Sequence, residues 1–86
     1  MALNVTVAAA HAAVWSGEAT RVSAKTVDGS IGILSGHEPV LGVLAPGEVT
    51  ITTPSGDVVK VHSDGGFLSV NRDDVTVAAD SAELIK

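Results

Sequence analysis

One short stretch concentrates the residue types that most often do chemistry, since residues 29–39 read GSIGILSGHEP. Gly29, Gly32 and Gly36 are of the kind found in phosphate-binding loops, where backbone amides and a lysine surround the phosphates. Their spacing fits neither the GxGxxG of a dinucleotide-binding turn nor the GxxxxGK of a P-loop, and no lysine follows Gly36. We therefore expect these glycines to shape turns.

The same stretch offers the residue types of a serine hydrolase in Ser35, His37 and Glu38. An α/β-hydrolase carries its nucleophile in GxSxG on a strand-to-helix turn, whereas Ser35 stands in Gly-Ile-Leu-Ser-Gly. Neighbours on an extended chain also point to opposite faces, so they do not converge on one substrate. A polar loop is the expected structure, and an esterase-like enzyme is a distant third candidate for the function.

Other candidates for chemistry are also weak. The three histidines, His11, His37 and His62, lie at least 25 residues apart, without the paired spacing of a zinc site. The pair Asp73 and Asp74 is typical of a turn. We expect no metal, no cofactor and no catalytic residue. His37 is the most informative of these side chains, because it stands beside the apolar run VLGVL, residues 40–44, which we interpret as a buried central strand or, alternatively, as a partly exposed contact with a partner.

Size and charge narrow the function further. With 86 residues and no cysteine, the chain is predicted to form a single domain over residues 1–86, without disulfides and in a reducing compartment. Ten acidic against five basic residues give a net charge of −5, which repels phosphate backbones and anionic headgroups. No apolar run approaches the roughly 20 residues that span a bilayer. We expect no nucleic acid partner and no direct membrane insertion.

The elements that must position these residues are short strands. Turn signals divide the chain at seven places, and apolar residues alternate with polar ones between them. This pattern predicts an all-β fold, a small antiparallel β-sandwich or flattened β-barrel of about eight to ten short strands. Only the last residues, ADSAELIK, suggest a helix, because Asp80 or Ser81 is a suitable N-cap.

Lipoyl and biotinyl carrier domains are β-sandwiches of this size and form the alternative from another functional class. They present the modified lysine at an exposed hairpin tip. Lys25 and Lys60 instead fall inside predicted strands, while the tips carry Asp-Gly and Ser-Gly. The carrier function is therefore the weaker hypothesis.

Five stretches in order make the chain resemble the N-terminal domain of the epsilon subunit of the rotary F-type ATP synthase. They are VWSGEA at 14–19, DGSIGIL at 28–34, GHEPVLGVLAPGEV at 36–49, DGGFLSV at 64–70 and VTVAADSAE at 75–83. The resemblance implies a non-catalytic rotor part of the central stalk that couples the gamma subunit to the c-ring, at the cytoplasmic face of a bacterial plasma membrane. It implies gamma contacts at Ala9 and His37, extending to the strand from Val40. Its c-ring contact corresponds to Asp28, Gly29 and Ser30.

Three departures from the family pattern matter. Ser35 stands where the family often has proline, and Ser30 stands where some relatives carry an acid. The family usually continues into a C-terminal helical hairpin, which we expect to be absent here because the sequence ends at Lys86. We accordingly expect that this polypeptide neither binds ATP nor inhibits ATP hydrolysis through its C-terminus.

Overall fold

The computed structural model describes residues 2–10 and 12–85, and its regular structure consists of strands alone. The all-β prediction is thus confirmed, at the upper end of the expected strand number. The ten strands are β1 Leu3–Ala9, β2 Ala12–Ala19, β3 Arg21–Thr26, β4 Gly29–Leu34, β5 Val40–Leu44, β6 Gly47–Thr52, β7 Val58–Ser63, β8 Gly66–Asn71, β9 Asp74–Ala79 and β10 Ala82–Ile85.

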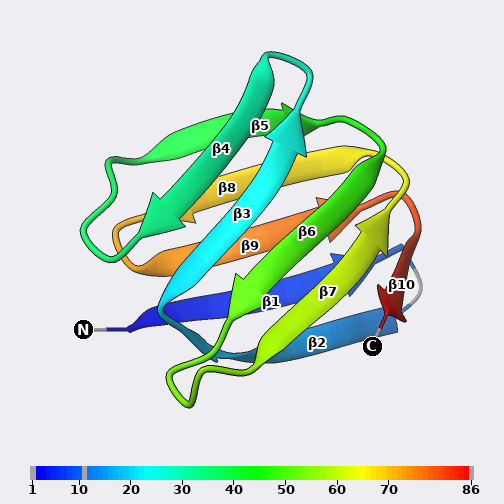
Figure 1. Ribbon diagram of the computed structural model, residues 1–86. Helices are drawn as coiled ribbons and strands as arrows, with labels where there is room; N and C mark the ends of the chain where they lie inside the picture. Colours follow the sequence, from blue (N-terminus) through cyan, green and yellow to red (C-terminus); the bar gives the residue numbers. More distant parts are fainter. Residues whose placement is uncertain (1, 11, 86) are drawn as a thin grey trace.

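The strands form one continuous sheet folded into two layers (Figure 1). Strands β5, β8, β9, β1 and β2 make the back layer of that view, and β4, β3, β6, β7 and β10 make the front layer. The layers join at one corner, where Thr26 pairs with Leu44 and the Ala45 N–H donates to the Lys25 carbonyl at 2.9 Å. On the opposite side β2 approaches β10 without pairing to it. The sheet is therefore a nearly closed, flattened barrel.

The core lies between the layers and consists mainly of valine, leucine and isoleucine. Strand β1 shows the predicted alternation, because Leu3, Val5 and Val7 are buried while Asn4 and Thr6 are exposed. The same alternation recurs in β3, β6 and β9, as the sequence indicated. Fully burying one such side chain stabilises the fold by about 1.5–3 kcal/mol. The largest fully buried side chains are Leu3, Ile33, Ile51 and Leu68.

One strand pair departs from the antiparallel prediction. Strand β1 pairs in parallel with β9, with Val5 opposite Val75 and Val7 opposite Val77. A parallel pair needs a long connection, and the chain between the two strands provides it by building most of the sheet. The two-residue periodicity is the same for parallel and antiparallel strands, so it did not reveal this pairing.

The prediction of a helix near the C-terminus is wrong. Residues Ala82–Ile85 form β10, in which Glu83 pairs with His62 and Leu84 pairs with Val61 of β7. The free edge of β7 satisfies the backbone groups of this short segment, and this tertiary pairing outweighs the capping signal of Asp80 and Ser81.

Candidate interaction surfaces

The predicted c-ring residues lie at an exposed hairpin tip, which consists of the turn between β3 and β4 and the first residues of β4 (Figure 1). Thr26 fixes this turn, because its Oγ1 donates to the Gly29 carbonyl at 2.7 Å and accepts from the Asp28 N–H at 3.2 Å. Gly29 has a φ of 127°, which side-chain-bearing residues rarely adopt. Asp28, Gly29 and Ser30 are all exposed, so the three predicted residues present one accessible surface at this tip.

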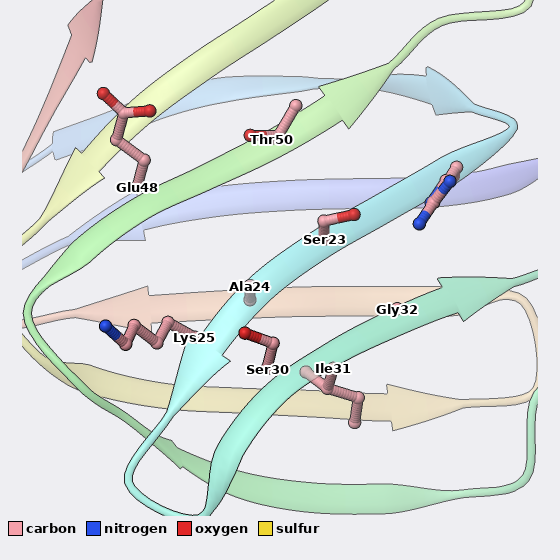
Figure 2. A pocket seen from close by; sticks show the side chains of 9 residues that line it. Ser23, Ala24, Lys25, Ser30, Ile31, Gly32, Glu48 and Thr50 are labelled. Carbon is pink, nitrogen blue, oxygen red and sulfur yellow. The ribbon is translucent and has the colours of Figure 1, made fainter.

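A shallow hollow of about 290 Å³ lies next to this tip, on the outer face of the front layer (Figure 2). Its rim carries the cations Arg21 and Lys25, the carboxylate Glu48 and the hydroxyls of Ser23, Ser30 and Thr50. Gly32 leaves room in it, since the nearest atom to a Cβ built there would be an Arg21 Nη atom at 3.8 Å. The hollow offers mixed charges and hydroxyl groups, which suit the polar side chains of a partner. Sequence reasoning missed it, because its residues come from three strands.

His37 lies half-buried in the loop of residues 35–39, which crosses from β4 to β5 at the left of Figure 1. Its backbone N–H donates to the Leu34 carbonyl at 3.1 Å, which closes a turn. The Nδ1 atom of its ring donates to the Glu38 carbonyl at 2.7 Å. Gly36 has a φ of 82°, so this position requires a residue that tolerates the left-handed region. These bonds hold the ring beside its own backbone.

Asp73, in the turn between β8 and β9, binds the same loop from the side. Its Oδ1 accepts a hydrogen bond from the Gly36 N–H at 2.9 Å and another from the Ser35 hydroxyl at 3.0 Å. The Gly36 bond first, and the Ser35 bond second, lower the pKa of the Asp73 carboxyl below its ordinary value, because both donors favour the charged form. The sequence indicated a turn at Asp73, which is confirmed, but gave no sign of this contact.

An apolar strip runs across the outer face of the back layer. Val43 of β5 pairs with Phe67 of β8, Phe67 pairs with Ala78 of β9, and Ala78 pairs with Ala8 of β1. Leu41 extends the strip along β5 and is 73% exposed, while Val43 is 47% and Phe67 is 53% exposed. We call Leu41, Val43, Phe67, Ala78 and Ala8 the apolar strip. The interpretation of residues 40–44 as a buried central strand is therefore wrong, and the alternative of partial exposure is correct.

The three predicted gamma residues are not neighbours. Val40 is half-buried and packs against the core, at the start of β5. Ala9 is half-buried at the end of β1, where the register with β2 shifts after Val7. Through the pairs of β5, β8, β9 and β1, Val40 aligns with Val5 rather than with Ala9, so the two residues lie at opposite ends of the back layer. The row of the apolar strip crosses the layer through Ala8, next to Ala9, and Leu41 extends the strip along β5 toward Val40. Sequence reasoning missed the strip, because alternation alone does not tell which outward-facing apolar residues lie side by side.

The remaining candidates stay apart from one another. His62 is exposed in β7, far in sequence from His37, and His11 lies outside the described residues. Across the part of the chain that the structure describes, His, Asp and Glu side chains form no group of three that could hold a metal ion. Lys25 and Lys60 lie inside β3 and β7, as predicted, and not at hairpin tips. Neither lysine therefore occupies the hairpin-tip position at which a carrier domain presents its modified lysine.

The fold is a two-layered, all-β sandwich, and its candidate residues lie on exposed surfaces. Residues 2–85 match the family model described as "ATP synthase, Delta/Epsilon chain, beta-sandwich domain". The chain belongs to this family, and the resemblance seen in the sequence is confirmed.

Three relatives in this family are 40–50% identical to the chain over the residues that align. It is 50% identical to the ATP synthase epsilon chain of Micrococcus luteus over 82 residues, which cover 95% of this chain and 90% of that one. It is 49% identical to the epsilon chain of Streptomyces griseus, of which it covers 66%. The epsilon chain of Frankia casuarinae is 40% identical over 84 residues and is covered to 99%. The chain therefore spans nearly the whole of two relatives and about two thirds of the third.

Solved structures show the same fold. A chain of the Euglena gracilis mitochondrial ATP synthase, in a structure of OSCP, F1 and c-ring, superposes with a TM-score of 0.91 at 24% identity, covering 96% of this chain and 53% of that one. A chain of the Tetrahymena thermophila central stalk and c-ring superposes with a TM-score of 0.76 at 21% identity, covering 94% and 65%.

These relatives confirm the expected class of protein. The chain is of the ATP synthase epsilon type, a non-catalytic stalk component rather than an enzyme. The family membership argues against the carrier and esterase alternatives. Among residues 2–10 and 12–85 there is no helix long and apolar enough to cross a membrane.

Proposed function

We propose that this chain couples the gamma subunit to the c-ring of an F-type ATP synthase by holding one partner on each of two surfaces. The apolar strip of the back layer binds gamma, and the β3–β4 tip binds the c-ring. Within that assembly the chain sits peripherally at the cytoplasmic face of a bacterial plasma membrane. Both structural neighbours belong to ATP synthase assemblies that contain a c-ring, and the relatives are bacterial, which supports this proposal.

The apolar strip is the observation that carries the proposal. Large apolar side chains that are exposed in one contiguous patch mark interaction sites, whereas single exposed ones are ordinary. Phe67 is the only phenylalanine of the chain, and it lies on the surface beside Val43 instead of in the core. Aromatic residues are enriched in the buried centres of protein interfaces. A stiff, close-packed sheet carries this patch at a fixed distance from the β3–β4 tip.

The predicted gamma residues flank the strip. Ala9 follows Ala8 directly, and the loop of His37 leads into the strand that carries Leu41 and Val43. We propose that Ala9 and His37 contact gamma at the two ends of the strip. Val40 is half-buried and packs against the core, so its contribution is to hold β5 in place while Leu41 and Val43 present their side chains.

The c-ring contact has a different chemistry. Asp28, Gly29 and Ser30 are exposed at the tip, and the polar hollow with Arg21, Lys25 and Glu48 lies beside them. A tip of backbone and short side chains can enter between the polar loops of a ring without burying a large charged side chain. We propose that Ser30 donates or accepts a hydrogen bond there in place of an ion pair, so residue 30 itself should add no salt dependence to this contact.

Replacing Phe67 by aspartate tests the gamma contact. A charge at the centre of an apolar interface is desolvated without a partner, so we expect Phe67→Asp to weaken binding to isolated gamma by about tenfold or more in calorimetry. Val58→Asp is the matched control, because Val58 is similarly exposed at 55% but lies in β7 of the front layer. Equal affinities of the two variants would exclude the strip as the gamma surface.

A further inference from the structure

Asp73 stands outside both proposed contact surfaces, yet it joins three separate segments. Its carboxylate binds Ser35 and Gly36 of the β4–β5 loop, more than 35 residues earlier in the chain. Its backbone carbonyl accepts the Asn4 N–H at 2.7 Å, at the start of β1. The side chain of the next residue, Asp74, accepts from the Asn4 side-chain amide at 3.3 Å and does not reach the loop. Asp73 is thus the residue of this turn that ties the loop to the body.

We propose that Asp73 is a positioning residue, which holds the loop of residues 35–39 so that His37 and the first residues of β5 meet the gamma subunit in a fixed geometry. This inference rests on the proposed function, because it assigns a role to Asp73 in the gamma contact. Asp73 itself need not touch the partner.

The local chemistry explains why the loop needs such a tie. Residues 35–39 belong to no strand, and Gly36 is free to leave its left-handed conformation at little steric cost. Within the loop, the bond from the His37 N–H to the Leu34 carbonyl closes one turn but does not join it to another segment. The bonds to Asp73 supply that connection, and hydrogen bonds to a charged acceptor are stronger than neutral ones. The lowered pKa of Asp73 is consistent with both donors binding its ionised form.

The position of these bonds limits their effect to the loop. Gly36 is exposed, and Ser35 and Asp73 are only half-buried, so the core does not depend on this contact. Breaking it should release a local segment and leave the global fold intact. A loop that is already ordered pays a smaller entropy cost when it binds, so the tie strengthens the gamma contact through pre-organisation.

The experiment compares Asp73→Ala with Asp74→Ala in the full chain. Amide hydrogen exchange of Gly36 and His37 reports the loop, and calorimetry reports the affinity for isolated gamma. We expect Asp73→Ala to speed the exchange of Gly36 by about tenfold and to weaken gamma binding by about three- to tenfold. Asp74→Ala removes a neighbouring carboxylate that does not contact the loop, so both quantities should stay as in the parent chain.

Two further variants separate positioning from a general loss of structure. Asp73→Asn keeps a side-chain oxygen that accepts the Gly36 N–H, so it should restore most of the protection and most of the affinity. Ser35→Ala removes only the hydrogen bond from the Ser35 hydroxyl, and it replaces Asp73→Ala in the experiment if that variant does not fold. It should speed Gly36 exchange and weaken gamma binding in the same direction, but less.

The outcomes distinguish this inference from the proposed function. If Phe67→Asp weakens gamma binding while Asp73→Ala speeds exchange without changing affinity, the positioning role is wrong and the strip remains supported. Should neither variant affect gamma binding, the proposed gamma contact fails as a whole. A loss of affinity in Asp73→Ala without faster Gly36 exchange would also overturn the positioning role.

Discussion

Trp15 lies directly over Gly17 at the open side of the barrel, where a Cβ on residue 17 would stand 3.0 Å from Cη2 of the indole ring. Both residues belong to β2, and they pair with Val7 and Val5 of β1. The ring packs against the core and, with Val58 and Leu84, lines the groove between β2 and the strands β7 and β10. The barrel thus uses its only tryptophan to close the side on which the strands do not pair.

Gly17→Val should displace this ring. The added side chain overlaps the indole, and overpacking of this kind costs about 1–3 kcal/mol. We expect a lower midpoint of urea unfolding and a red shift of the emission of Trp15. Gly32→Ala is the control, because its Cβ would meet no atom closer than 3.8 Å and its φ lies outside the left-handed region. Unchanged emission in Gly17→Val would contradict the contact.

Gly66 is the position where the backbone tolerates no side chain at all. Its Cβ would clash with the Ala78 carbonyl oxygen and stand 2.6 Å from the Ala79 Cα, and its φ is 121°. Gly66→Ala should therefore lose more than about 3 kcal/mol of unfolding free energy or fail to fold. Gly56→Ala isolates the steric part, since Gly56 also has a positive φ, 92°, but has open space around it. Denaturant unfolding measures the free energy of unfolding of each variant. Similar losses in both would contradict the prediction, because they would mean that the clash at residue 66 adds no cost.

The strands that face water on one side were predictable from the sequence. In β3 and β9 the alternation of Val22 and Val77 with polar neighbours identifies both the element and its buried face. The residues of β5 alternate in burial without alternating in polarity, because Leu41 and Val43 are outward and apolar. Leu41 and Val43 belong to the strip that we propose binds gamma, and the rule that assigns apolar residues to the core fails for them.

Long-range relationships were not predictable. The contact between Ser35 and Asp73 spans 38 residues, and a turn signal at Asp73 names no distant partner. Strand β10 was missed for a similar reason, since the four residues Ala82–Ile85 have no strong preference of their own and gain their structure from the edge of β7. The candidate contacts Asp28, Gly29 and Ser30 came from the family resemblance, and the structure adds that they share one exposed tip.

Acid should release the loop that Asp73 holds. The pKa of Asp73 is lowered in the folded chain, so the stabilisation from its bonds is complete above the ordinary aspartate pKa of about 3.9 and is lost as the pH falls through the lower folded value. We expect the Gly36 amide resonance to move in a single titration step below about pH 4. The step should vanish in Asp73→Asn, whose side chain does not titrate. A Gly36 titration that persists in Asp73→Asn would assign it to another carboxyl.

Two tip glycines give a matched test of the c-ring contact. Gly29 is the first residue of β4 and Gly56 lies in the turn between β6 and β7; they have positive φ values of 127° and 92° and no other atom within 4 Å of a built Cβ. Alanine at either position should cost about the same stability, of the order of 1 kcal/mol, because each must be forced into the left-handed half of φ. Only Gly29→Ala changes the shape of the tip that carries Asp28 and Ser30.

We therefore expect Gly29→Ala to weaken association with purified c-rings several-fold, while Gly56→Ala binds as the parent chain does. Pull-down on c-rings in detergent, repeated at low and high salt, measures both the affinity and its salt dependence. Because Ser30 brings no charge to the tip, any salt dependence of the affinity of the parent chain should come from Asp28 and from the charged side chains of the neighbouring hollow. Equal binding by the two alanine variants, at equal stability, would place the c-ring contact elsewhere on the barrel.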